Sequence, residues 1–477
     1  MVSFLTGRFE PVRREVTQLD LEVRGTIPDW LDGRYVRNGP NPVLGLLAEN
    51  HNWFTGDGMV HGVRLSGGDA LWYRNRWVDS EVTSRSLGRG HPDERHRSPL
   101  HGPSANTNVI GFGGRLLALV EGGAASAELS PELDTVDVCD FEGAVRGGYS
   151  GHPLVDPRTG ELHAVAYHFG RGSAVQYTVI GPDGRLRRKM SVPVGGSPMM
   201  HAFSLTKDYV VLYDLPVTFD ADAAVIDLPR PLRPIARLAL DATVGRVAMP
   251  RTILNRIPPV PAGRFPYRWN PDHPARVGLL PRSATDASAI TWIELDRPCY
   301  VFHPMNAHND DRSVTVDLVV HERVFDKDPS GPTEGKPRLE RWCVDLRART
   351  VRRTRLSDEH LEFPRMDDRF ATSASGQGWA VGGSDDDMGE RKLVRTAGAE
   401  GVVVERDFGT ASSVGEFTFA PSSATAPEGD GVVLGFVTDL AASSTDLLIL
   451  DAQTLEDVAA VRLPQRVPAG FHGNWID

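Results

Sequence analysis

The sequence predicts an all-β protein, and three observations support this fold class. Short apolar or alternating runs rich in Val, Leu, Ile and Tyr recur along the 477 residues, among them RLLALVE, DYVVLYDLP, SVTVDLVVHERV, GVVLGFVTDL and TDLLILD. Runs of this length and composition are typical of β-strands. Turn sequences such as DPRTGE, GPDGR and DAQTLE separate them, and this spacing continues along the whole chain without alternating β–α units. The pattern favours a β-propeller or a stack of sheets, but no strict repeat gives the number of blades.

The composition describes a globular protein with a large core, and we treat residues 1–477 as one domain. Hydrophobic residues make up 40% of the chain and charged residues 24%. The formal net charge is −11, and no basic stripe is present, so nucleic acid is not an expected partner. The three cysteines, Cys139, Cys299 and Cys343, lie far apart and are odd in number. They are expected to be reduced core residues.

The chain has no recognisable signal peptide and no apolar run long enough for a membrane span, so the expected location is the cytoplasm. Residues 223–265 depart from the strand pattern because they are rich in Pro, Arg and apolar side chains. The stretch PIARLALDATVGRVAMPRTIL within them can form short amphipathic helices with cationic flanks, which suits peripheral membrane contact. An ordinary capping helix followed by a loop explains the same composition.

Four of the fifteen histidines share a local setting, next to an aromatic or small residue just before a predicted strand: His152, His201, His303 and His472. His472 lies only five residues before the last residue, where a chemical role is otherwise unexpected. Ligands this far apart in the chain must come from different strands, and a propeller brings its inner strands together at the axis. By ligand type alone, four imidazoles suit Fe(II), Cu or Zn.

The segments around these histidines resemble the carotenoid cleavage oxygenase family. The similarity rests on GRYVRNGPNP, WFTGDGMVHGV, ANTNVIGFGGRLLALVEGG, HPLVDPRTGEL, MMHAFSLTKDYVVLYD, FHPMNAHND, LEFPRMD, GEFTFAPSSATAPEGDGVVLGFV and GFHGNW, which follow one another in order from about residue 24 to the end. The resemblance implies a seven-bladed β-propeller with a dome of loops and helices over the iron face. It also implies an Fe(2+) on the axis, bound by His152, His201, His303 and His472.

The resemblance assigns further residues to the site. Three glutamates, Glu121, Glu362 and Glu416, match carboxylates that orient the ligand imidazoles, a contact that fixes the tautomer of a histidine and raises its basicity. Thr107 matches a residue whose methyl group leans over an open coordination position. Phe54 and Phe302 match aromatic residues of the substrate tunnel, although aromatic residues at such places are also ordinary core.

Family members add O2 across a conjugated C=C bond to give two carbonyl products. Members that cleave phenolic stilbenes or phenylpropenes usually have a Lys directly before the Glu of the EGG motif, where this chain has Val120. Their tyrosine partner has no clear counterpart, since the nearby residues are Val82 and Thr83. A site without these polar groups suits an apolar ligand. We therefore expect a carotenoid or apocarotenoid substrate.

Two alternatives remain open at this point. The first is cleavage of a phenolic stilbene or phenylpropene, of the lignostilbene or isoeugenol type. The second is an inactive propeller that binds a lipid, although all four histidines and all three glutamates are present.

Overall fold

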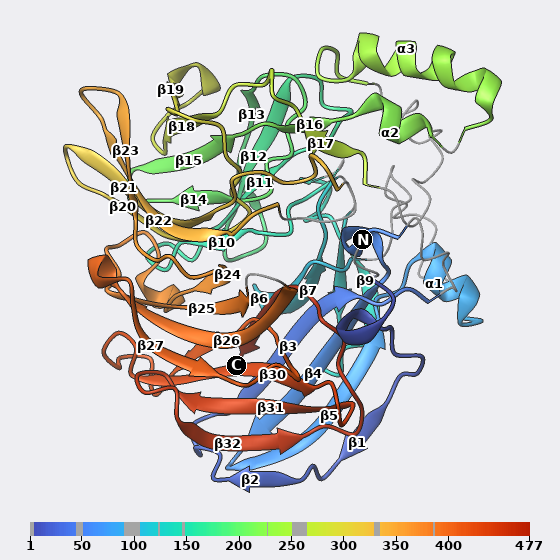
Figure 1. The fold of residues 1–477 in the computed structure, drawn as a ribbon, viewed down its shortest axis with the longest axis vertical. Coiled ribbons are helices and arrows are strands. Elements are labelled where there is room, and N and C mark those ends of the chain that lie inside the picture. Colours follow the sequence, from blue (N-terminus) through green and yellow to red (C-terminus); the bar gives the residue numbers. More distant parts are fainter. Residues whose placement is uncertain are drawn as a thin grey trace.

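The computed structural model describes residues 4–43, 51–89, 105–122, 125–145, 148–226, 228–249, 265–328, 334–384 and 387–477. These residues form a seven-bladed β-propeller, in which each blade is an antiparallel sheet (Figure 1). A separate pair of short strands, β16 (Val217–Phe219) and β17 (Tyr267–Trp269), lies outside the seven blades. The expected fold class is confirmed, and so is the number of blades that the family resemblance implies.

Five of the blades are built from four strands that are consecutive in the chain or nearly so. The first two blades contain β6 (Asn108–Phe112), β7 (Arg115–Leu119), β8 (Ser126–Leu129) and β9 (Thr135–Cys139), and then β10 (Leu154–Val155), β11 (Leu162–Ala166), β12 (Ala174–Ile180) and β13 (Leu186–Pro193). The third contains β14 (Phe203–Leu205), β15 (Tyr209–Asp214), β18 (Arg276–Pro281) and β19 (Thr291–Glu294). The last two contain β20 (Pro304–Asn309), β21 (Ser313–Val320), β22 (Arg338–Asp345) and β23 (Thr350–Arg355), and then β24 (Leu361–Arg365), β25 (Gln377–Ser384), β26 (Asp387–Ala397) and β27 (Val402–Asp407).

The two remaining blades combine the two ends of the chain and so close the ring. In one, β1 (Thr17–Leu19), β5 (Asp69–Trp77), β4 (Gly58–Ser66) and β3 (Gly33–Pro40) are joined by the last strand, β33 (Gly473–Ile476). In the other, β2 (Val23–Gly25) is followed by β32 (Asp457–Arg462), β31 (Ser444–Asp451), β30 (Gly431–Asp439) and β28 (Ser412–Val414), and β29 (Thr418–Pro421) also pairs with β30. The blue and red strands therefore lie side by side in Figure 1.

The sequence runs that predicted strands form β7, β15, β21, β30 and β31. Their central residues are buried, because both faces of a blade pack against neighbouring blades. Large aromatic side chains such as Trp342 and Trp379 fill these interfaces and are almost completely buried. The three cysteines are free, and Cys343 is only half-buried, whereas Cys139 and Cys299 lie in the core as expected.

Helices are few and short among the described residues. They are the α-helices α1 (Glu81–Ser86), α2 (Ala221–Val225) and α3 (Arg233–Thr243), and the 3-10 helices η1 (Gly7–Phe9), η3 (Trp53–Thr55), η5 (Arg230–Leu232), η6 (Ala287–Ala289), η7 (Asp368–Phe370) and η8 (Gly398–Glu400). In the part of the chain that the structure describes, no helix combines the length and the apolar character needed to cross a bilayer.

The segment 223–265 contains the expected amphipathic helix. Its described residues include the end of α2 and the whole of α3, while residues 227 and 250–264 lie outside the described ones. Helix α3 lies at the edge of the molecule (Figure 1). Leu232, Ile235 and Leu238 follow one another at three-residue spacing, and their exposed fractions are 52%, 71% and 72%. This spacing places them on one face of the helix turn.

Candidate metal centre

Each blade has one strand at its inner edge, and these inner strands contact one another around the axis. The chain places one residue of the site at or just before each inner strand: Thr107 at β6, His152 at β10, His201 at β14, His303 at β20, Glu362 in β24, Glu416 before β29 and His472 at β33. Since the strands start at the same end of the propeller, residues far apart in the sequence meet at one point.

The four predicted histidines do meet. The ring centroid of His152 lies 4.2 Å from that of His201, 4.7 Å from that of His472 and 5.4 Å from that of His303. The His303 and His472 centroids lie 4.8 Å apart, and the Nε2 atoms of His201 and His303 are separated by 3.3 Å. All four side chains are mostly buried, so the structure brings the predicted cluster together.

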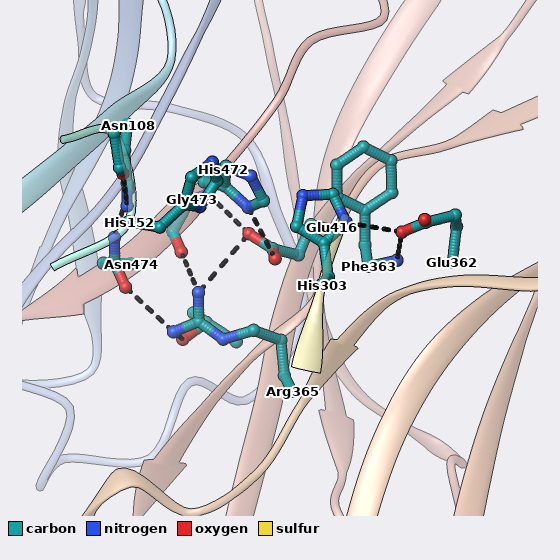
Figure 2. A network of polar contacts seen from close by, with 12 residues as sticks. Asn108, His152, His303, Glu362, Phe363, Arg365, Glu416, His472, Gly473 and Asn474 are labelled. Atoms are coloured by element: carbon teal, nitrogen blue, oxygen red, sulfur yellow. Dashed lines mark hydrogen bonds and ion pairs between the residues drawn. The ribbon is translucent and has the colours of Figure 1, made fainter. Parts of the chain in front are cut away.

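Two of the three predicted glutamates contact one of the four predicted histidines each. Glu362 accepts a hydrogen bond from Nδ1 of His303 at 2.6 Å, and Glu416 accepts one from Nδ1 of His472 at 3.0 Å (Figure 2). The second oxygen of Glu416 accepts the backbone N–H of Gly473 at 2.8 Å. These carboxylates hold the proton on Nδ1 and leave the Nε2 lone pair available for a metal.

Glu121 contacts two histidines. Its carboxylate lies 3.0 Å from Nδ1 of His201 and 3.1 Å from Nε2 of His152, and it accepts the hydroxyl of Tyr167 at 2.8 Å. The possible donor atoms of His152, His303 and His472 lie within 4.8 Å of one another, and so do those of Glu121, His152 and His201. His152 belongs to both groups, which makes the two groups one continuous set of donors.

Charge and burial act against each other at these groups. Burial opposes ionisation of Glu362, but His303 and His321 outweigh it and hold the pKa of this carboxyl well below its usual range. Burial also opposes ionisation of Glu121, yet His201 and His152 lower its pKa. Burial, reinforced by the neighbouring His201, keeps the pKa of His152 well below its ordinary value. At His303 burial opposes protonation, but Glu362 outweighs it and raises the pKa of the ring. A bound metal requires ionised carboxylates and neutral imidazoles, so it would displace a proton from His303.

The donor set fits a divalent transition metal. The Nε2 atoms of His201 and His303 lie 3.3 Å apart, and in neutral rings with the proton on Nδ1 both lone pairs would be available to one cation. Neutral imidazoles bind Fe, Cu and Zn ions. His201, His303 and His472 would therefore hold such an ion through Nε2, with a carboxylate behind each ring, while Nε2 of His152 lies against Glu121.

Thr107 lies beside the histidine cluster. Its hydroxyl donates to Oδ1 of Asn106 at 3.1 Å, and its backbone oxygen accepts the N–H of His472 at 3.2 Å. Its methyl group faces Gly151, the residue before His152, because a Cβ at Gly151 would lie 2.6 Å from Thr107 Cγ2. Only glycine at position 151 lets the Thr107 methyl group and the His152 backbone pack this closely.

Aromatic side chains enclose the histidines on one side. Phe302 lies edge-on to His201 at a centroid distance of 5.0 Å, and Phe363 stacks on His303 at 5.3 Å. Phe54 stacks on Phe302 at 6.0 Å. Phe54 and Phe302 therefore stand next to the cluster, as a substrate-lining role requires, and they also belong to a hydrophobic core. Phe363 was not singled out in the sequence.

Val120 is buried and packs in an apolar cluster that includes Val78 and Ala105. Its neighbour Glu121 contacts the histidines, so Val120 lies within one residue of the site. The surroundings of Val120 among the described residues are apolar, and whether it touches substrate remains a prediction.

The sequence interpretation missed three residues that support the carboxylates. His321, just after β21, contacts Oε1 of Glu362 through Nε2 at 2.7 Å, and Tyr167 donates to Glu121. Arg365 lies 3.5 Å from Glu416 and donates to Oδ1 of Asn474 at 2.8 Å (Figure 2). His321 and Tyr167 each directly follow a strand end, but nothing in the local sequence distinguishes them from ordinary core residues.

Comparisons with known proteins match almost the whole chain. The family model described as Retinal pigment epithelial membrane protein matches residues 9–477. The carotenoid cleavage oxygenase of Mycobacterium tuberculosis is 44% identical over 493 residues, which cover 99% of this chain and 97% of that protein. The isoeugenol monooxygenase of Pseudomonas nitroreducens is 29% identical over 515 residues, which cover 99% of this chain and 97% of that protein.

Solved structures share the fold. The lignostilbene dioxygenase of Pseudomonas brassicacearum superposes with a TM-score of 0.82 and 25% identity over 99% of this chain and 98% of that one. Cobalt-substituted Synechocystis ACO gives a TM-score of 0.80 at 23% identity, covering 98% of this chain and 97% of that one, and shows the shared fold alone. The chain belongs to the carotenoid cleavage oxygenase family and is an oxygenase that cleaves double bonds.

Proposed function

We propose that this protein is an Fe(II)-dependent dioxygenase that cleaves a conjugated C=C bond of a carotenoid or apocarotenoid with O2 into two carbonyl products. The observation that carries the proposal is the axial cluster of four imidazoles with three carboxylates behind them. Four neutral nitrogen ligands without a thiolate suit Fe(II), and zinc, which has no redox chemistry, would not activate O2. When bound, iron supplies the redox chemistry that lets O2 react with an alkene.

The protein's own residues supply orientation and a dry setting. Glu362 and Glu416 fix the rings of His303 and His472, so the nitrogen atoms that face the axis cannot turn away. Phe302 and Phe363 cover the imidazoles with apolar surface, which keeps water from competing with an apolar substrate. The Thr107 methyl group lies beside Gly151 at the edge of the cluster and restricts access there.

The choice of substrate rests on Val120 and on the relatives. An apolar side chain at this position offers no partner to a phenolic hydroxyl, while it packs well against a polyene. The relative with 44% identity is named a carotenoid cleavage oxygenase. A second candidate function, cleavage of a phenolic stilbene or phenylpropene, is favoured by the isoeugenol monooxygenase at 29% identity and by the lignostilbene dioxygenase structure.

Helix α3 fits peripheral contact with a membrane. A carotenoid dissolves in lipid, so an enzyme that takes it up benefits from an apolar surface that can lie in the bilayer interface. Leu232, Ile235 and Leu238 form such an apolar stripe, and Arg237 on the same helix contacts Asp222 and Asp241. The proposed location of the protein is the cytoplasm, with reversible attachment to lipid through this helix.

The test is a metal analysis combined with a substrate panel. Purified protein should contain close to one iron per chain, because the donors form one connected set. The iron-loaded enzyme is incubated with carotenoids, apocarotenals, resveratrol and isoeugenol, and the aldehyde products are identified by mass spectrometry. Cleavage of phenols alone would replace our first candidate with the second, and a metal-free inert protein would contradict both.

A further inference from the structure

His168 is a buried histidine whose tautomer can be assigned from a contact. It follows β11 and is only 4% exposed. Its Nδ1 accepts the backbone N–H of Gly170 at 3.0 Å, within a turn closed by the N–H of Arg171 and the oxygen of His168. An imidazole that accepts at Nδ1 carries its proton on Nε2. Burial, and then the nearby Arg171, lower the pKa of His168 to about 3, so the ring is neutral.

The Nε2–H of His168 has no hydrogen-bond partner within the described part of the chain. Buried donors are nearly always paired, because an unpaired one loses its contact with water and gains nothing in return. A donor left unpaired in this way is ready for an acceptor that arrives with a ligand. The neutral ring favours an uncharged oxygen, such as a carbonyl or a hydroxyl.

The position of His168 connects the metal centre with the region of helix α3. The preceding residue, Tyr167, donates to Glu121 at 2.8 Å. Two residues later, the oxygen of Gly170 accepts the N–H of Met249 at 2.9 Å, a few residues beyond the end of α3. His168 therefore lies between the centre and the exposed apolar helix along the same stretch of chain.

A series of aromatic side chains runs from His168 to the ligand histidines. Consecutive ring centroids in it lie 4.2 to 6.1 Å apart. The series is His168, Phe169, Phe219, Tyr267, Phe265, Phe54, Phe302 and His201. Between its two terminal histidines the series is aromatic throughout, with Tyr267 as its one hydroxyl-bearing ring. Extended aromatic surface with a polar group at the end is the lining expected for a long apolar ligand that has one oxygen at its end.

We propose that His168 determines specificity by donating its Nε2–H to an oxygen at the end of the substrate. The substrate class is then a polyene that ends in a carbonyl or hydroxyl group, rather than a hydrocarbon carotene. This inference rests on the proposed function, because it concerns a polyene that reaches the same metal centre. His168 holds the end of the substrate and takes no part in breaking the double bond.

The test compares two substrates in three proteins. An apocarotenal and a hydrocarbon polyene of equal conjugated length are given to the wild type, His168→Leu and His168→Gln. His168→Leu removes the donor, so KM for the aldehyde should rise about 10- to 100-fold with kcat little changed, while values for the hydrocarbon stay within about twofold. His168→Gln retains an N–H donor and should restore most of the lost affinity.

Binding of the apocarotenal under nitrogen, followed by its visible absorption, separates this proposal from the proposed function. A wild type that binds the aldehyde more tightly than the hydrocarbon, yet cleaves neither, would contradict the proposed function and leave the role of His168 intact. Equal losses of affinity for both substrates in His168→Leu, or no loss for either, would overturn the proposed role of His168. If the Leu variant does not fold, equal wild-type affinity for aldehyde and hydrocarbon overturns it as well.

Discussion

The axial centre and helix α3 contrast in how their geometry is determined. At the axis, each of the four histidines contacts a carboxylate from another blade, and the side chains are mostly buried. On α3, Ile235 and Leu238 are more than two-thirds exposed, at 71% and 72%. The first region depends on the whole ring of blades, whereas the second depends on a single helix of eleven residues.

This difference indicates which substitutions the protein tolerates. A removed partner at the axis leaves a buried charge or an unpaired donor, which is costly in a low-dielectric interior. A changed residue on α3 meets water on most of its surface and affects only what the helix touches. Predictions made for the two regions therefore differ in size, and the measurements below test that order.

The largest effect is expected at His303. His303→Ala removes one imidazole and leaves Glu362 ionised beside an empty volume, so iron content and cleavage should fall to near zero. Metal analysis and product assays measure both. His273→Ala is the matched control, because His273 also pairs with a buried carboxylate, Asp214 at 2.7 Å, away from the axis. Full iron retention in His303→Ala would refute the ligand assignment.

Glu362→Gln should have a smaller effect, because the four proposed metal ligands remain. The amide cannot accept from His303 and His321 as an ionised carboxylate does, so iron affinity or turnover should fall about 10- to 100-fold. Glu340→Gln provides the control, since Glu340 is equally buried but accepts from Trp342 and Arg353 within its own blade. An unchanged iron titration and unchanged turnover in Glu362→Gln would show that this carboxylate does not support the centre.

The two regions also differ in how well the sequence predicted them. The strand runs and turns gave the all-β class from local composition alone, because alternation and turn residues act locally. The blade number and the ligand set came from the family resemblance, since contacts between widely separated strands leave no periodic signal. His321 and Tyr167 were missed because each looks like a core residue at a strand end, and Arg365 because an arginine at a strand end looks like a surface residue. The apolar stripe of α3, in contrast, could be predicted from the spacing of the apolar residues within that segment alone.

Val120→Lys tests whether the apolar side chain next to Glu121 determines the substrate preference. A phenolic hydroxyl buried without a partner costs about 1–3 kcal/mol, which corresponds to about one to two powers of ten in catalytic efficiency. The variant should shift the preference toward resveratrol or isoeugenol by that factor. Val120→Met is the control, because methionine is about as long as lysine but has no charge. This variant should keep the preference for apocarotenals. A wild type that cleaves hydroxystilbenes and leaves every carotenoid intact would contradict our interpretation of Val120.

The smallest effect on chemistry is expected for the α3 double variant Ile235→Asp/Leu238→Asp. The two substitutions replace apolar surface with charge at the most exposed positions of the stripe, so partitioning into liposomes should fall by at least about tenfold. Flotation of the protein with vesicles of neutral and anionic phospholipid measures this. Cleavage of an apocarotenal dispersed in detergent should change by less than about twofold, since the axis is untouched.

The control for α3 must remove similar apolar surface elsewhere. Leu19→Asp/Val136→Asp does so, because Leu19 and Val136 are 54% and 53% exposed on outer strands of two blades. If flotation depends on α3 alone, this control floats like the wild type. Equal flotation of the α3 variant and the wild type would remove the membrane role of the helix, and the stripe would then need another partner. A loss of cleavage in detergent would instead show that α3 and the axis are coupled, which breaks the contrast between the two regions.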